Sequence, residues 1–311
     1  MNRREFAKTL GAAAAAIGLG SRGLANENHP TQFAITMDDF AWRNAIHLTA
    51  ERRNQAILNT LASSKVKAAL FVVGGFVDNE PGKALLRSWD DAGHIIGNHT
   101  YSHRFLGSGI SATQYEKDIL QAEEVLKDFK RFRKIFRYPL LKEGRTAAMR
   151  DHVRAFLRQH GYRIGHVTID NSDWIVDQRL AARLQKDPNA DVKPYRDFYL
   201  EHMWDRAQYY DSLARRVLGR PVKHTILMHF NLLNGLFLGD LIEMFRSKGW
   251  QLIDAEDAFT DPVFLSAPKV LPAGESIVWA LAKETGKIAK ALRYPAEDGE
   301  YERAKMDRLG L

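Results

Sequence analysis

The chain has 311 residues, of which 45% are hydrophobic and 27% are charged, and this composition is typical of a globular protein with one large domain or two small ones. It contains no cysteine, which excludes disulfide bonds and thiolate metal ligands. No apolar stretch in the sequence is long enough to span a bilayer comfortably.

The first 25 residues resemble an export signal rather than part of a fold. The paired arginines Arg3 and Arg4 precede a short alanine-rich apolar run at 10–19, and small residues at 23–25 suit a cleavage site. This pattern predicts a twin-arginine signal, and therefore a periplasmic or secreted protein without a stable membrane span after the signal is removed. The alternative is a disordered basic N-terminus followed by an alanine-rich helix.

The signal also changes the charge balance. The whole chain has a net charge of +7, and four basic residues and one acidic residue lie within the first 25. The remaining chain has 41 basic and 37 acidic residues, a net charge of about +4. Because no basic stripe with interleaved aromatic residues accompanies this small excess, we do not expect a nucleic-acid partner.

From residue 33 onwards, short apolar runs alternate with longer amphipathic segments. In chain order, the expected strands are Phe33–Met37, Ala68–Val73, His94–Gly97, Ile135–Tyr138, Ile164–Ile169, Thr225–Met228 and Gln251–Ile253. The expected helices between them are 51–62, 82–92, 112–129, 146–160 and 238–248. Alternating strands and helices imply parallel strands with right-handed crossovers. We therefore expect an α/β fold, a distorted or incomplete (β/α) barrel of about seven strands.

Two regions lie outside this alternation. Residues 175–223 form a helical insertion rich in aromatic side chains, which could stack on sugar rings, although their helical spacing favours packing. Residues 262–311 form a C-terminal helical extension with an amphipathic helix near 275–292. Its charged end, from Pro295, is expected to be mobile. The main domain is expected to occupy residues 26–261.

Polar residues with catalytic potential stand where the expected strands end. They are Asp38 and Asp39 after the first strand, His99 and His103 after the third, Arg137 at the fourth, Asp170 and Asp173 after the fifth, and His229 after the sixth. In a barrel, the carboxyl ends of the strands converge on one face, where catalysis occurs. The spacing therefore predicts one shared active site.

Three of these residues suit a metal ion. Asp39, His99 and His103 would supply one carboxylate and two imidazoles, and a mononuclear hydrolytic site needs about three protein ligands and an open position. Asp38 would then be free for proton transfer. Neither the aspartate pair nor the histidine pair is specific evidence of a metal site by itself. Adjacent aspartates after a strand, for example, often form a solvated turn.

Five motifs, in order over roughly residues 33–260, resemble those of the polysaccharide deacetylase family, the NodB-homology domain of carbohydrate esterase family 4. They are Thr36-Met37-Asp38-Asp39-Phe40 for TFDDG, His99-Thr100-Tyr101-Ser102-His103 for H(S/T)xxH, Arg137-Tyr138-Pro139-Leu140 for RxPY/F, Asp170-Asn171-Ser172-Asp173-Trp174 for DxxDW, and Ile226-Leu227-Met228-His229 for the last strand end. The resemblance implies that 26–261 is a NodB-like deacetylase domain.

The resemblance also implies roles for the acidic and histidine residues. Asp38 would be the catalytic base, and His229 would be the general acid that protonates the leaving group. Asp39, His99 and His103 would bind a divalent metal, commonly Zn²⁺, with Co²⁺, Ni²⁺ or Mn²⁺ as alternatives.

Further residues would support this chemistry. By the resemblance, Arg137 would orient Asp38 and Asp170 would tune the general acid. The backbone N–H of Leu140 would stabilise the oxyanion. Leu140, Tyr138 and Trp174 would contact the substrate.

The sequence departs from the family pattern at three positions. Phe40 replaces the glycine of the first motif, Leu140 replaces the usual aromatic residue, and Leu141 replaces the usual glycine. We therefore expect a differently shaped loop and a different substrate wall.

The expected function is that of an exported metal-dependent deacetylase, acting on N-acetyl or O-acetyl groups of an acetylated polysaccharide or oligosaccharide. One alternative is a hydrolase of linear or cyclic non-sugar amides on the same fold. The other is a non-catalytic carbohydrate-binding protein. The polymer, the native metal and the oligomeric state stay open from the sequence.

Overall fold

The computed structural model describes residues 30–286, 288, 292–293 and 299–311. The expected signal segment, 1–25, lies outside these residues, as does part of the helix expected near 275–292. Among the helices of the described residues, none is both long and apolar enough to span a membrane.

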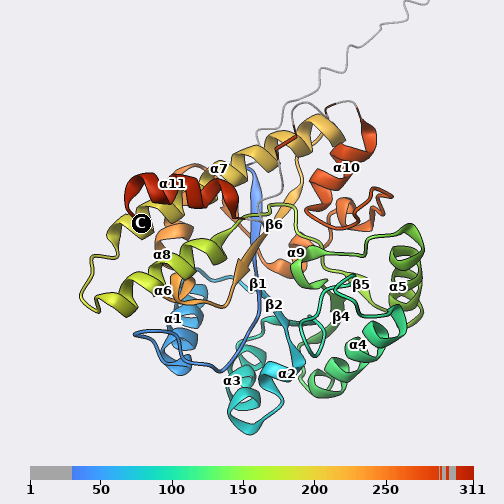
Figure 1. Cartoon of the computed structure of the whole chain (residues 1–311), viewed down its shortest axis with the longest axis horizontal. Coiled ribbons are helices and arrows are strands. Elements are labelled where there is room, and N and C mark those ends of the chain that lie inside the picture. Colours follow the sequence, from blue (N-terminus) through green and yellow to red (C-terminus); the bar gives the residue numbers. More distant parts are fainter. Residues whose placement is uncertain (1–29, 287, 289–291, 294–298) are drawn as a thin grey trace, which may run out of the picture.

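A parallel sheet of seven strands lies at the centre of the fold, with helices arranged around it (Figure 1). The strands are β1 Gln32–Asp38, β2 Ala69–Val72, β3 Ile95–Asn98, β4 Phe132–Phe136, β5 Arg163–Ile164, β6 Lys223–His229 and β7 Gln251–Leu252. Their order is β5-β4-β3-β2-β1-β6, and β7 also pairs with β1. The prediction of an incomplete (β/α) barrel of about seven strands is confirmed.

The fifth strand is much shorter than its apolar run predicts. Only Arg163 and Ile164 pair with β4, and Ile169 returns later as an isolated bridge to Ile226 of β6. Between them, the N–H of Thr168 already bonds to the Thr225 carbonyl of β6. The chain therefore passes from β4 to β6 within a few residues. Because β5 is so short, the barrel wall stays open between β4 and β6.

The helices surround these strands and follow the predicted alternation. They are α1 Ala50–Ser63, α2 Gly74–Val77, α3 Glu80–Asp91, α4 Ala112–Leu126, α5 Ala147–Gln159, α6 Asp173–Lys186, α7 Lys193–Leu218, α8 Leu232–Ser247, α9 Ala255–Ala258, α10 Ile277–Thr285 and α11 Glu300–Leu309, with 3₁₀ turns η1 Pro139–Leu141 and η2 Pro262–Leu265. Local sequence explains several starts. For example, Ser111 and Gln114 form a reciprocal capping box at α4.

The insertion consists of α6 and α7, and its aromatic residues pack into the core. Tyr195, Phe198, Tyr199 and Tyr210 are buried in the main apolar cluster of the domain. The Tyr199 hydroxyl also donates to the Asn234 side chain at 2.6 Å. Packing, the role that helical spacing favours, is therefore confirmed for these four residues.

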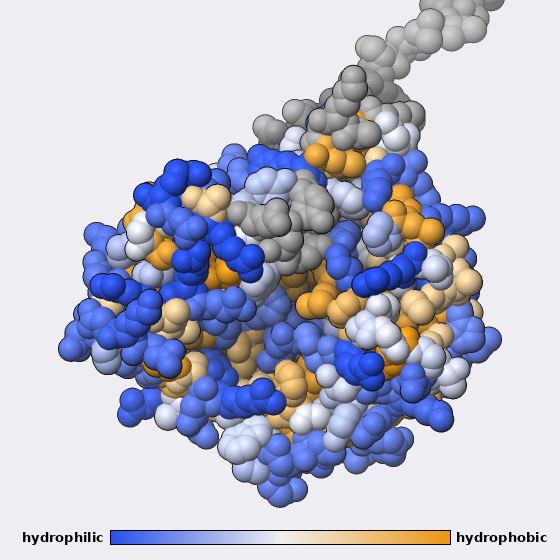
Figure 2. Space-filling model, in the orientation of Figure 1, coloured by the Kyte–Doolittle hydropathy of each residue, from blue (hydrophilic) through white to orange (hydrophobic). Residues whose placement is uncertain are grey.

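Of the end that was expected to be mobile, from Pro295, residues 295–298 lie outside the described part of the chain, and residues 299–311 contradict the expectation. Residues 300–309 form α11, which lies beside α7 (Figure 1). Met306 is fully buried, and buried Glu302 accepts a hydrogen bond from Arg206 at 2.8 Å. Charge along this segment was a misleading signal because one of its charges is paired inside the protein. Figure 2 shows that the viewed face is mainly hydrophilic, with smaller hydrophobic areas around its hollowed middle.

Candidate active site

A pocket of about 360 Å³ opens where β1, β3 and β6 end. Its lining residues are Asp38, Asp39, His99, His103, Leu140, Leu141, Trp174, Leu227 and His229. The convergence predicted from the strand ends therefore occurs, and it brings together residues up to 191 positions apart.

Asp39, His99 and His103 form a compact cluster of potential metal ligands. Their ligand atoms all lie within 4.8 Å of one another, and Asp39 Oδ1 lies 3.0 Å from His103 Nε2 and 3.6 Å from His99 Nε2. His99 Nδ1 lies 2.8 Å from the Arg137 carbonyl, which can only accept, so Nδ1 must carry the proton. The Nε2 lone pair is then directed into the cluster, as in metal-binding histidines.

The protonation states also suit a cation. Burial alone would raise the pKa of Asp39, but the hydrogen bond and charge of His103, together with His229 and His99, lower it. Burial lowers the pKa of His99, despite the opposing charges of Asp38 and Asp39. The cluster therefore offers an ionised carboxylate at Asp39 and a neutral imidazole at His99, which are the forms that bind metal, whereas at His103 the hydrogen bond and charge of Asp39 outweigh burial and raise the pKa.

Asp38 is held beside this cluster by a buried arginine. Its Oδ1 accepts from Arg137 Nη1 at 2.7 Å, and its Oδ2 lies 3.7 Å from His99 Nε2. Arg137 is itself fixed, because it donates to the Gly165 carbonyl at 2.7 Å and to the Thr36 hydroxyl at 2.9 Å. One carboxylate oxygen of Asp38 is therefore occupied, while the other is directed toward the ligand cluster.

His229 lies across the pocket and is paired with Asp173. Its Nδ1 is 2.6 Å from Asp173 Oδ1, and its backbone N–H donates to Oδ2 at 3.0 Å. Burial would lower the pKa of His229, but the charge and hydrogen bond of Asp173, with Asp39 and Asp38, raise it to about 10. His229 is therefore a proton donor across the neutral range, with its Nε2 available to the pocket.

The carboxylate that contacts His229 is thus Asp173, where the resemblance implied Asp170. Asp170 is fully buried, and the chain then turns at Asn171, whose amide donates to the Leu227 carbonyl. Asp173 is the first residue of α6, and Asn234 donates to its Oδ2 at 2.9 Å. The motif DxxDW contains both aspartates, so the signal was present in the sequence, although the resemblance pointed to Asp170 and not to Asp173 as the partner of His229.

Backbone strain is concentrated at this pocket. In the described chain, five of the eight non-glycine residues with positive φ belong to the motifs around it: Asp39, Thr100, His103, Leu140 and Leu141. Each such conformation costs about 1–3 kcal/mol and persists only where the surrounding structure enforces it. The pocket is therefore a site where geometry is maintained against local preference, as is common in active sites.

Residues 25–165 match the family model for polysaccharide deacetylases. This confirms the resemblance to that family. Over 70 residues, the chain is also 36% identical to the peptidoglycan-N-acetylglucosamine deacetylase of Bacillus cereus, and this alignment covers 22% of this chain and 24% of that protein.

Solved deacetylase structures support the same fold. One is a mutant of a CE4 family pseudoenzyme with restored enzymatic activity, at 18% identity and a TM-score of 0.51, covering 74% of this chain and 68% of that one. The wild-type pseudoenzyme is from Bacillus anthracis. Another is a mutant of the peptidoglycan deacetylase PdaC from Bacillus subtilis, at 20% identity and a TM-score of 0.50, covering 75% of this chain and 91% of that one.

Only some of the residues expected to shape the substrate wall or to contact the substrate reach the pocket. Leu140 is half exposed at the pocket, where the family has an aromatic side chain, and Trp174 also lines the pocket. Phe40 is fully buried and packs on Phe230, with ring centroids 4.6 Å apart, so it does not reach the pocket. Tyr138 is buried against Phe136, at 4.9 Å between centroids, and does not line the pocket.

The C-terminal extension contacts the loop that carries Leu140. The Glu143 N–H donates to the Ala273 carbonyl at 2.9 Å, and the Glu275 N–H donates to the Leu141 carbonyl at 3.2 Å. Lys142 and Glu275 form an ion pair across the same contact. The extension thereby braces two consecutive left-handed leucines, an arrangement for which the sequence gives no local signal.

A second contact joins the extension to the loop that carries Asp173. Glu302 of α11 lies 3.5 Å from His202 Nδ1, and His202 Nε2 accepts from the Ser172 N–H at 3.1 Å. Burial lowers the pKa of His202 to about 4, so its neutral ring can accept this bond. Gly299 packs against Trp174, because a Cβ there would lie 3.1 Å from the indole. Residues beyond 262 therefore contact and support two loops at the pocket, the one that carries Leu140 and the one that carries Asp173.

Proposed function

We propose that this protein is an exported, metal-dependent deacetylase that hydrolyses N-acetyl or O-acetyl groups of a polysaccharide. The proposal rests on the composition of one pocket, which contains three side chains that could bind a cation. The same pocket holds the Asp38 carboxylate, fixed by Arg137, and His229, whose protonated form Asp173 stabilises. These are the parts that hydrolysis of an acyl group requires: a base, an acid and a site for charge stabilisation.

The donor set fits a divalent metal. Asp39, His99 and His103 would hold it, since the Nε2 atoms of both histidines lie within 3.6 Å of Asp39 Oδ1. Nitrogen and oxygen donors in this number suit Zn²⁺, with Co²⁺, Ni²⁺ or Mn²⁺ as alternatives. When bound, such an ion would make water a better nucleophile at neutral pH and polarise the acyl carbonyl.

Asp38 is the base in this proposal. Its free oxygen faces the ligand cluster, so it can accept the proton of the attacking water, while Arg137 keeps the carboxylate in place. The side chain of Arg137 is buried and lies over the Phe71 ring at 3.8 Å, which excludes water from the pair. Asp38 therefore needs no reorientation before proton transfer.

His229 is the acid. Its Nδ1 is engaged by Asp173, so its Nε2 proton can pass to the leaving nitrogen of an acetamide or the leaving oxygen of an ester. The buried Asp173 carboxylate stabilises the protonated ring before the transfer and keeps its hydrogen bond to the Nδ1–H once the ring is neutral. The N–H of Leu140 would stabilise the oxyanion, as the family resemblance implies.

Two observations favour a polysaccharide over the alternatives. The relative from Bacillus cereus bears the name of a peptidoglycan-N-acetylglucosamine deacetylase, and the arginine pair at 3–4 favours an exported protein that would meet a cell-envelope or environmental glycan. A non-catalytic binding protein is less favoured because Asp38, His229 and all three ligands are present together. A hydrolase of non-sugar amides would use the same machinery and is distinguished by its substrate.

Acetate release tests the activity. Chitooligosaccharides, acetylated xylan and peptidoglycan fragments would be incubated with the protein before and after chelation, and again after Zn²⁺, Co²⁺, Ni²⁺ or Mn²⁺ is restored. We expect release that chelation abolishes and metal restores, with about one metal per chain. The control is the double variant His99→Ala, His103→Ala, which should lose metal because one ligand remains. Stoichiometric metal in that variant would refute the ligand assignment.

Export is tested separately. Replacing Arg3 and Arg4 with lysine should leave precursor in the cytoplasm, because the arginine pair is the recognised feature of the twin-arginine signal. Fractionation of producing cells would measure this. Unchanged export of the variant would contradict the interpretation of the N-terminus.

A further inference from the structure

A second cavity lies where the barrel wall is open. Because β5 ends at Ile164, and the residues after it reach β6 only around Thr168 and the isolated Ile169–Ile226 bridge, no strand of the described residues closes the wall between β4 and β6 at this point. The segment after α9 returns along this gap, where Phe259 packs edge-to-face on Phe71. A cavity of about 200 Å³ remains between this segment, β5 and α5.

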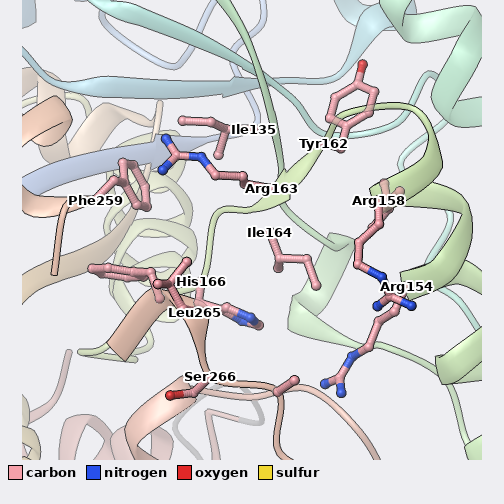
Figure 3. Close-up of a pocket in the computed structure, with 13 residues that line it drawn as sticks. Ile135, Arg154, Arg158, Tyr162, Arg163, Ile164, His166, Phe259, Leu265 and Ser266 are labelled. Carbon is pink, nitrogen blue, oxygen red and sulfur yellow. The ribbon is translucent and has the colours of Figure 1, made fainter. Parts of the chain in front are cut away.

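The walls of this cavity are mainly apolar. Ile135, Leu157, Ile164, Phe259, Phe264 and Leu265 contribute to them. Leu265 is 79% exposed, an unusual exposure for a leucine, and it lies at the edge of the cavity beside His166 (Figure 3). An apolar surface left open to water in a concave site is typical of ligand-binding pockets.

The polar lining carries a one-sided charge. Of the 13 residues that line the cavity, three are arginines, Arg154, Arg158 and Arg163, and none is an aspartate or glutamate. Arg154 is already paired, with Glu143 behind it at 2.6 Å. The guanidinium groups of Arg158 and Arg163 make no hydrogen bond or ion pair within the described part of the chain. The cavity therefore has an excess of two positive charges beside an apolar wall.

The arginines approach the cavity from two sides. In Figure 3, Arg154 and Arg158 extend from α5 on one side, while Arg163 extends from β5 toward Phe259 on the other. A guanidinium can bind a carboxylate or sulfonate through two N–H groups, and it also packs well on aromatic rings. The apolar wall between them would cover a hydrocarbon body.

We propose that this cavity binds a small organic anion with an apolar body, such as an aromatic or short-chain carboxylate. The anionic group would pair with Arg158, the charge of Arg163 on the opposite side would add to the attraction, and the body would lie against Ile164, Phe259 and Leu265. This site is separate from the deacetylase pocket, with which it shares no lining residue. The inference therefore does not depend on the proposed catalytic function.

A pair of fluorescent probes tests the proposal on the full-length protein. The two probes, 8-anilinonaphthalene-1-sulfonate and N-phenyl-1-naphthylamine, share a ring system, but only the first carries a negative charge. We expect the sulfonate to bind at one site per chain, and benzoate and octanoate to displace it. In Arg158→Gln, Arg163→Gln, its affinity should fall about tenfold, while binding of the uncharged probe changes by less than about twofold. The control Arg52→Gln, Arg216→Gln, which removes two exposed arginines elsewhere, should bind both probes as the parent does.

A second variant covers the case in which the arginine substitutions disturb the cavity itself. Leu265→Glu adds a carboxylate at the exposed edge and should weaken the sulfonate without weakening the uncharged probe. Leu309→Glu is its control, because Leu309 is also exposed and lies on α11. Unchanged sulfonate affinity in the double-arginine variant would overturn the proposal. Equal weakening of both probes there, combined with no selective effect of Leu265→Glu, would also overturn it.

Discussion

Replacing Gly274 with alanine should impair catalysis, although Gly274 lies in the C-terminal extension and does not line the pocket. Gly274 has φ +122°, and a Cβ built there would lie 1.9 Å from the Leu141 carbonyl oxygen, where ordinary contact begins at 3.4 Å. The backbone conformation costs a non-glycine residue about 1–3 kcal/mol, and a Cβ cannot remain 1.9 Å from a backbone oxygen without movement of the neighbouring atoms. To remove this overlap, either the Leu140–Lys142 turn or the segment 273–275 that contacts it must move by roughly 1.5 Å.

This displacement is large for an oxyanion donor. Misplacement by about 1 Å can cost about 10²-fold in rate, and loss of one donor costs about 10²–10³-fold in kcat. We expect kcat of Gly274→Ala to fall by at least about tenfold, with bound metal unchanged and equal losses on an acetamide and an activated aryl ester. Acetate release, metal content and thermal unfolding of the same preparation would measure this.

The matched control is Gly219→Ala. Gly219 also has positive φ, at +69°, but no atom lies within 4 Å of its added Cβ. This variant should lose about 1–2 kcal/mol of stability and keep its kcat. If Gly274→Ala retains the parent kcat per folded molecule, or if Gly219→Ala loses as much activity, the brace does not position the turn and the reasoning is refuted.

Four substitutions test the roles of the individual residues in the pocket. Asp38→Asn should retain metal but lose on the order of 10²–10⁴-fold in kcat; loss of metal instead would make Asp38 a ligand. His229→Ala should retain metal and be impaired more on an acetamide than on a nitrophenyl ester, because an amine must be protonated to depart; equal impairment would contradict the general-acid role. Since Asp173 raises the pKa of His229 to about 10, the acid form should persist below that value and be lost as pH rises through it. Asp173→Asn should therefore move the alkaline limb of the kcat/KM profile to lower pH, whereas Asp170→Asn should move it less; the reverse order would restore the assignment implied by the motif.

The sequence by itself predicted the architecture and the composition of the pocket. Each of the seven apolar runs overlaps a strand, although the fifth shares only Ile164 with β5, because buried strands of a parallel sheet require continuous hydrophobic residues. Asp38, Asp39, His99, His103 and His229 meet because parallel strands direct their carboxyl ends to one face. These features depend on periodicity and on chain order, which a sequence states directly.

The tertiary structure decided which carboxylate serves His229. Side-chain direction alternates predictably only while a strand continues, and β5 ends at Ile164, well before the motif that contains both aspartates. The direction of Asp170 and Asp173 then depends on the turn at Asn171 and on the start of α6. Similarly, Tyr138 follows β4 and is buried in the core instead of facing the pocket.

The support of the active-site loops was also decided by tertiary structure alone. Lys142 and Glu275 are 133 positions apart, and Glu302 lies 100 positions beyond His202. No local pattern relates such residues, because their contact depends on how α10, α11 and the preceding segment pack against the barrel. Composition identified the C-terminal residues as charged, but only packing shows that Glu302 is buried against Arg206 and that residues 273–275 hold the turn at Leu140. The sequence determined which chemical groups are present at the pocket, and the tertiary structure determined what holds them in position.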